Sequence, residues 1–145
     1  MPRFVLIRSA RDIDLAILAA AGLDCRIDVV SAPDAGIRAG ALWWKALVDG
    51  HADSVGVALL DCGDSPGRTM GAFRAGVRDV LFRGSDALAA PLAQIAEAQG
   101  ARLWREAPEA LDLDRARDAE AACRAWLAGE APARPGPRPL PRLRN

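Results

Sequence analysis

At 145 residues, with 51% hydrophobic and 26% charged residues, the chain has the length and composition of one globular domain, which excludes disordered and membrane-spanning classes of protein. The formal net charge is zero, but four arginines lie in residues 130–145, so residues 1–129 carry 15 basic and 18 acidic side chains. This mildly acidic body argues against nucleic-acid binding.

The cysteines indicate a reducing, cytoplasmic compartment. Cys25, Cys62 and Cys123 are odd in number and far apart, so neither a disulfide framework nor a zinc site is predicted. Charged residues interrupt the apolar start of the chain at residues 1–23, and no run is long enough to span a bilayer. Arginine far outnumbers lysine, with Lys45 the sole lysine, as expected of a GC-rich bacterial genome.

Five short apolar runs predict β-strands. They occupy residues 4–7, 26–31, 55–60, 77–82 and 101–104. The first, third and fourth runs are typical of strands buried on both faces, whereas Asp28 and Arg102 mark the second and fifth as edge strands. This contrast favours a five-stranded parallel sheet in the flavodoxin-like order 2-1-3-4-5.

Helical patterns follow each run and complete a three-layer α/β sandwich with helices on both faces of the sheet. The expected helices span residues 9–22, 33–50, 65–76, 84–100 and 114–128. Pro91 falls inside the fourth, so either that helix begins near it or its first turn is irregular. The α/β domain is expected to end at residue 129, and the proline- and arginine-rich residues 130–145 to form an extended, flexible tail.

Ligands of such sheets bind beyond the carboxyl ends of the strands, here near the switch point between the first and third strands. The residues that this rule selects, called the predicted rim below, are Arg8, Ser9, Asp12, Asp61, Cys62, Asp64, Ser65, Arg68, Arg83 and Ser85.

Two chemistries suit the predicted rim. Asp61 and Asp64 could share Mg²⁺, but the sequence favours the alternative in which Asp64 or Ser65 caps the next helix while Asp61 satisfies loop amides. The amides of residues 65–68, with Arg8 close by, could instead hold a small anionic ligand such as phosphate. Neither a Walker A nor a Gly-x-Gly-x-x-Gly pattern is present, so no nucleotide is predicted.

Nucleophilic catalysis finds little support. Cys62 precedes a helix, whose dipole would activate the thiol, but two flanking aspartates oppose this, and a structural cysteine is the alternative. The sole histidine, His51, falls at the opposite, strand-entry edge of the sheet, so no Cys-His pair is expected. In Trp43-Trp44, periodicity places Trp44 in the core and leaves Trp43 either packed beside it or available to a partner.

The segments Asp-Ser-Val-Gly-Val-Ala-Leu-Leu-Asp at residues 53–61 and Ala-Phe-Arg-Ala-Gly-Val-Arg-Asp-Val-Leu-Phe at residues 72–82 resemble receiver domains of bacterial response regulators. The resemblance implies a flavodoxin-like fold and matches Asp61 to the family's phosphoacceptor. The chain departs from the pattern in having Arg8-Ser9 in place of the metal-binding acidic pair, and Arg105 near the place of the conserved lysine. The resemblance therefore implies a degenerate receiver-like module.

Three functional hypotheses follow. The first is a non-catalytic, regulatory module that binds a protein partner, a second copy of itself or a small ligand, with Trp43 at the contact. The alternative is a small metabolic enzyme that acts on a phosphorylated or carbonyl substrate at the predicted rim. In the third, the proline- and arginine-rich tail recruits a partner.

Overall fold

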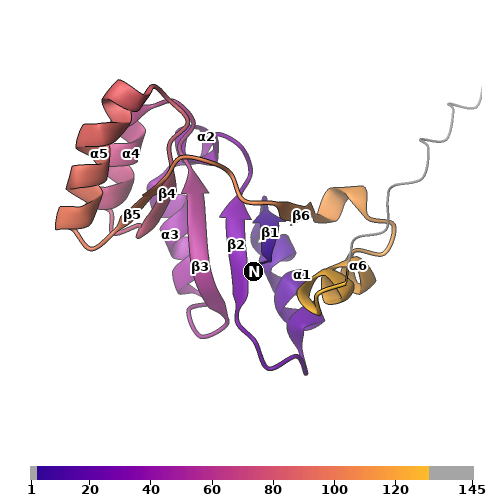
Figure 1. Cartoon of the computed structure of the whole chain (residues 1–145). Helices are drawn as coiled ribbons and strands as arrows, with labels where there is room; N and C mark the ends of the chain where they lie inside the picture. The colour runs from indigo at the N-terminus through magenta and orange to yellow at the C-terminus, as the bar shows by residue number, and fades with distance from the viewer. Residues whose placement is uncertain (1–2, 131–145) are drawn as a thin grey trace, which may run out of the picture.

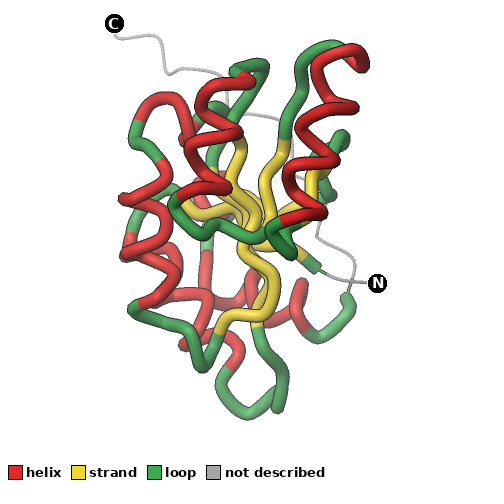
Figure 2. The backbone as a smooth tube through the Cα atoms, turned by 90° about the vertical axis from the view of Figure 1, so that its left-hand side faces the viewer, coloured by secondary structure: helices red, strands yellow, loops and turns green. Residues whose placement is uncertain are grey.

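The computed structural model describes residues 3–130, which form an α/β fold with a parallel sheet flanked by helices (Figure 1). This is the coarse arrangement that the prediction of a three-layer α/β sandwich requires. The strands are β1 (Phe4–Ile7), β2 (Ile27–Ser31), β3 (Val55–Asp61), β4 (Asp79–Leu81), β5 (Arg102–Trp104) and β6 (Ala110–Asp112). Figure 2, turned by 90°, shows the strands at the centre with helices beside them.

The predicted strand order and strand number are wrong. The sheet has six strands in the order β5-β4-β3-β2-β1-β6, and every neighbouring pair is parallel. The chain therefore crosses the sheet strand by strand from β1 to β5 and then returns to place β6 on the free side of β1 (Figure 1). The sequence did not predict β6, because this strand has only three residues and follows shortly after β5.

Asp28 explains why β2 was mistaken for an edge strand. Its carboxylate accepts a hydrogen bond from the backbone N–H of Val57 at 2.8 Å, at the point where the pairing of β2 with β3 shifts register. A bulge leaves an amide outside the ladder, and Asp28 satisfies that amide from within the sheet. The polar residue thus serves a central strand, whose Ile27 and Val29 are both fully buried.

The helices lie near the expected places, with two differences: the last one begins at Ala119 instead of about residue 114, and the one expected over residues 33–50 is divided in two. They are α1 (Ala10–Ala20), α2 (Ala35–Arg38), α3 (Ala41–Asp49), α4 (Pro66–Arg74), α5 (Asp86–Ala98) and α6 (Ala119–Leu127), with a 3₁₀ turn over Leu113–Arg115. The single helix expected over residues 33–50 is broken at Gly40, whose φ of +91° is left-handed. Pro91 lies inside α5, which begins at Asp86.

Three apolar clusters fill the fold, the smallest of which is made of Phe82, Ala89 and Leu92. The largest joins one set of strand side chains to residues of all six α-helices. The second is made of strand side chains, with Phe4, Leu59 and Leu81 fully buried in it. The ring of Trp104 in β5 packs edge-on against Phe4 in β1, with 5.7 Å between the ring centres, so side chains of two strands four positions apart in the sheet meet over this cluster.

The last helix is fastened to the first strand. Trp126 of α6 is buried, and its indole N–H donates to the carbonyl of Phe4 at 2.8 Å. The guanidinium of Arg3 lies 4.8 Å from the centre of the Trp126 ring and donates to the carbonyl of Gly129 at 3.1 Å. The described chain therefore ends beside the entry of β1, and the predicted tail, apart from residue 130, lies outside the described residues.

Candidate functional site

The predicted rim does lie along one edge of the sheet, because all six strands are parallel and their carboxyl ends meet there. The expected switch point between the first and third strands is wrong, however, since β2 separates β1 from β3. The charged side chains of this edge consequently form two separate groups, one beside β1 and β6 and one beyond β2, β3 and β4.

Arg8 organises the group beside β1 and β6. Its guanidinium forms a two-pronged pair with Asp112, with N···O distances of 2.6 and 3.1 Å, and lies 3.4 Å from Asp114. These hydrogen bonds from Arg8 lower the pKa of Asp112 and raise the pKa of Arg8 itself. The Asp12 carboxylate accepts the Arg8 backbone N–H at 2.9 Å, and Ser9 precedes α1 without a side-chain capping bond.

Asp61 stands at the centre of the second group. Its side chain is 6% exposed, and Oδ1 accepts the backbone N–H of Gly63 at 2.8 Å. The Arg83 guanidinium lies 3.4 Å from the same oxygen and donates to Asp34 at 2.8 Å. Asp61 thus satisfies a loop amide, which was one of the two alternatives that the sequence left open, and Asp34 is a member of the group that the sequence did not single out.

The hydroxyl groups of the rim cap helices. Ser65 accepts the backbone N–H of Arg68 at 3.1 Å and begins α4, which confirms the predicted cap. Ser85 plays the same part for α5, with a bond of 3.4 Å from Leu88. Asp64 is exposed and makes no such bond.

A magnesium ion at this edge would depend on Asp61 and Asp64. The Asp61 carboxylate faces the loop amide and the Arg83 guanidinium, while Asp64 is exposed. Within residues 3–130, no three His, Cys, Asp or Glu side chains are grouped so that they could hold a metal ion.

Cys62 has the environment of a structural cysteine. The side chain is fully buried, and this burial, with a smaller contribution from the charge of Asp61, raises the pKa of its thiol to about 12. A thiol with that pKa is protonated at neutral pH and is a poor nucleophile. The exposed cysteine is Cys25, in the loop before β2, for which the sequence offered no distinguishing signal.

The Arg105 side chain forms hydrogen bonds with the loop after β4. Its guanidinium donates to the carbonyls of Phe82 and Gly84 at 2.6 and 2.7 Å and to the Asp86 carboxylate at 3.0 Å. It also lies 5.3 Å from the centre of the Phe82 ring. These contacts give Arg105 a structural role in the fold.

The two tryptophans of α3 differ in exposure. Trp44 is 1% exposed, and its indole nitrogen has no hydrogen-bond partner in the part of the chain that the structure describes, so packing holds it in place. Trp43 is half-buried, and its ring centre lies 5.9 Å from that of Trp44. Leu42, which precedes them, is 74% exposed.

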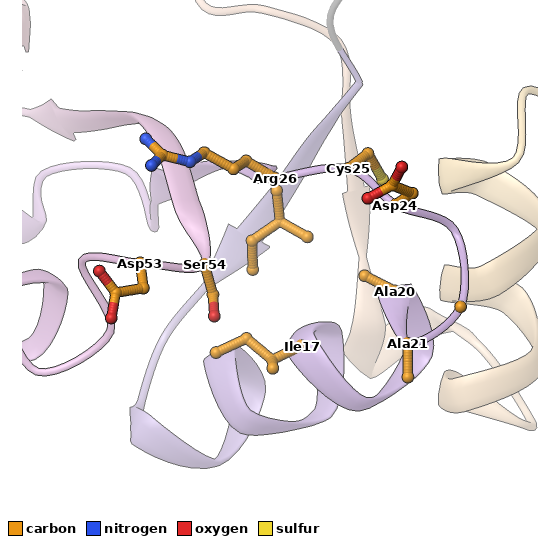
Figure 3. Close-up of a pocket in the computed structure, with 10 residues that line it drawn as sticks. Ile17, Ala20, Ala21, Asp24, Cys25, Arg26, Asp53 and Ser54 are labelled. Carbon is orange, nitrogen blue, oxygen red and sulfur yellow. The ribbon is translucent and has the colours of Figure 1, made fainter.

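Two hollows open at the opposite edge of the sheet, where the strands begin. One, of about 410 Å³, lies between the end of α1 and the starts of β2 and β3. The other, of about 370 Å³, adjoins it at the carboxyl end of α3. They share Ile17, Asp53 and Ser54 and therefore form one surface, called the entry groove below (Figure 3). The sequence gives no sign of this groove, and the general rule for parallel sheets points to the opposite edge.

His51 lies in the entry groove. Its Nε2 is 2.9 Å from the Asp14 carboxylate and its Nδ1 is 3.0 Å from the carbonyl of Leu47. Since both neighbours are acceptors, both bonds form only when the ring carries two protons. The bond to Leu47, followed by that to Asp14, accordingly raises the pKa of His51.

Comparison of the sequence with protein-family models and with curated proteins finds no match. Among residues 3–130, no helix is both long enough and apolar enough to cross a membrane.

Proposed function

We propose that the chain is a non-catalytic interaction module that associates with a second copy of itself through the outward side of α3. The observation that carries this proposal is the 74% exposure of Leu42 beside the half-buried Trp43. Exposed leucine and tryptophan surface on one helix favours burial against another protein, and aromatic side chains contribute strongly to such contacts.

The charge on α3 supports an identical copy as the partner. The only charged side chains of this helix, Lys45 and Asp49, lie one turn apart with 3.2 Å between their charged atoms. The helix therefore has no net charge, so two copies meeting across a two-fold axis avoid like-charge repulsion. In an antiparallel contact, each lysine would face the acidic end of the other helix.

The rim supports the non-catalytic part of the proposal. Arg8 and Arg83 form ion pairs with carboxylates, and Arg105 donates hydrogen bonds to two carbonyls and a carboxylate. A substrate at this edge would have to displace these contacts. For the receiver-like hypothesis, the contacts of Asp61 with Gly63 and Arg83 support a module without phosphoacceptor chemistry.

Light scattering after size exclusion tests the association. The wild-type mass should rise from that of the 15.3 kDa chain towards twice this value as concentration increases. Leu42→Asp should remain a monomer at every concentration while keeping the wild-type circular dichroism spectrum. Leu88→Asp is the matched control, because Leu88 is also exposed, at 47%, but lies on α5. A wild-type protein that stays monomeric, or a Leu42→Asp variant that still dimerises, would overturn the proposal.

A further inference from the structure

The entry groove combines an apolar floor with an acidic border. Ile17 and Ala20 of α1 contribute to the floor, and in Figure 3 Asp24 and Asp53 lie on opposite sides of the hollow. Neither of these two aspartates pairs with a basic side chain of residues 3–130, and both are exposed. The groove thus offers carboxylates above a surface that can accept aliphatic stems.

The adjoining hollow adds two aspartates that already have partners, since Asp14 pairs with His51 and Asp49 with Lys45. Asp24 and Asp53 are the groove carboxylates that keep no cation among residues 3–130, and Arg26 is the basic side chain that lines the groove beside them. The final turn of α1 also ends at this groove, and the carboxyl end of a helix carries partial negative charge. A cationic segment of chain is therefore the occupant that suits its charge.

The chain itself contains such a segment. Residues 131–145 include Arg134, Arg138, Arg142 and Arg144 and no acidic residue, with Leu140 and Leu143 among prolines. A guanidinium matches a carboxylate with two parallel hydrogen bonds, and its stem packs on apolar surface.

The described chain ends on the same side of the sheet as the groove. Arg3 holds the carbonyl of Gly129 and immediately precedes Phe4, which pairs with Asp28 of β2. The neighbouring Ile27 lines the groove, so only strand spacings of about 5 Å separate the two places. An extended chain of 15 residues can span about 50 Å, which is ample for this path.

We propose that the entry groove binds residues 131–145 of the same chain, with tail guanidinium groups against Asp24 and Asp53. Binding within one molecule raises the effective concentration of the tail at the groove. The interaction is electrostatic in large part, so salt weakens it.

Paramagnetic relaxation in the full-length chain tests the proposal. A nitroxide is attached in the double variant Leu18→Cys, Cys25→Ser, because Leu18 is 55% exposed on α1 beside the groove but does not line it. Cys62 and Cys123 are buried and should not react. The backbone amide signals of the four tail arginines should lose most of their intensity and regain it when the nitroxide is reduced.

Charge variants and a mixing experiment complete the test. Asp24→Asn combined with Asp53→Asn should restore the tail signals, whereas Asp64→Asn, which removes an exposed carboxylate at the opposite edge, should not. Tail signals that are unaffected by the nitroxide, or an effect that survives loss of both groove carboxylates, would refute the proposal. Broadening in a mixture of unlabelled nitroxide-bearing chains and ¹⁵N-labelled chains would assign the groove to the tail of a second copy, and would also refute it.

Discussion

Replacing Gly36 with alanine should destabilise the protein, although alanine is the better helix former. Gly36 lies in α2, directly above the end of β3, and a Cβ there would lie 2.5 Å from the Sγ of Cys62 and 3.0 Å from the carbonyl oxygen of Asp61. Forcing a methyl group into a packed interior costs about 1–3 kcal/mol. We expect the free energy of unfolding to fall by about 2 kcal/mol, because the backbone oxygen cannot move away by rotation of a side chain.

Gly71→Ala is the matched control for this substitution. Gly71 lies inside α4, and a Cβ at that position would meet nothing within 4 Å. Replacing an unhindered helical glycine stabilises a protein by about 0.5–1 kcal/mol. In urea denaturation followed by circular dichroism at one protein concentration, the two substitutions should therefore move the midpoint in opposite directions.

A double-mutant cycle with Cys62→Ala separates the two steric contacts. Removal of Sγ relieves the contact at 2.5 Å but leaves the Asp61 carbonyl and the Cys62 Cα, at 3.0 and 3.2 Å. The cycle should show a favourable coupling that recovers only part of the Gly36→Ala loss. An alanine at position 36 that leaves the midpoint unchanged, or full recovery by Cys62→Ala, would refute this account of the packing.

Three further outcomes follow from the contacts. Arg83→Met should lower the free energy of unfolding by about 1–2 kcal/mol in urea titrations, because Asp61 keeps its charge but loses its cation; no loss would contradict the role given to this pair. NMR titration should place the pKa of His51 above 6.5, and Asp14→Asn should lower it. Protonation strengthens the folded contacts of His51, so the stabilisation that His51 gives the folded state should be complete below about pH 6.5 and be lost as pH rises through the raised pKa. Melting temperatures of the wild type and of His51→Gln, compared at each pH, measure this loss. A thiol reagent should modify one cysteine rapidly in the folded protein, and Cys25→Ser should abolish that phase; rapid reaction of two or more would contradict the burial of the others.

The sequence predicted those structural features that depend on interactions between residues close together in the chain. The continuous apolar runs marked β1 and β3, and the Ser65-Pro66 pair marked the start of α4, because a serine cap acts within a few residues of itself. The alternation of strand and helix likewise identified the α/β class. These features depend on periodicity and capping, which can be seen in a single window of sequence.

The strand order depends on contacts between residues far apart in the chain, which no short stretch of sequence can show. Asp28 looked like a sign of exposure, but it satisfies an amide of β3 that lies 29 residues further along the chain. Arg8 was expected to face a ligand, and its partner Asp112 is 104 residues away. In both cases the residue type was informative about polarity, while the partner that determines its role became apparent only in the folded chain.

The observed order also moves the place where a ligand crevice would be expected. The chain travels from β1 to β5 in one direction and then returns to β6, so the direction reverses at β1, between β2 and β6. At that boundary, the two-pronged pair of Arg8, which follows β1, and Asp112, which ends β6, already joins these two strands. At the carboxyl edge, Arg8 and Arg83 are thus paired with carboxylates of the same chain, whereas the entry groove keeps Asp24 and Asp53 without a cation among residues 3–130. Because unmatched charge beside an apolar hollow attracts an opposite charge, the strand-entry edge is the more informative place to look for binding.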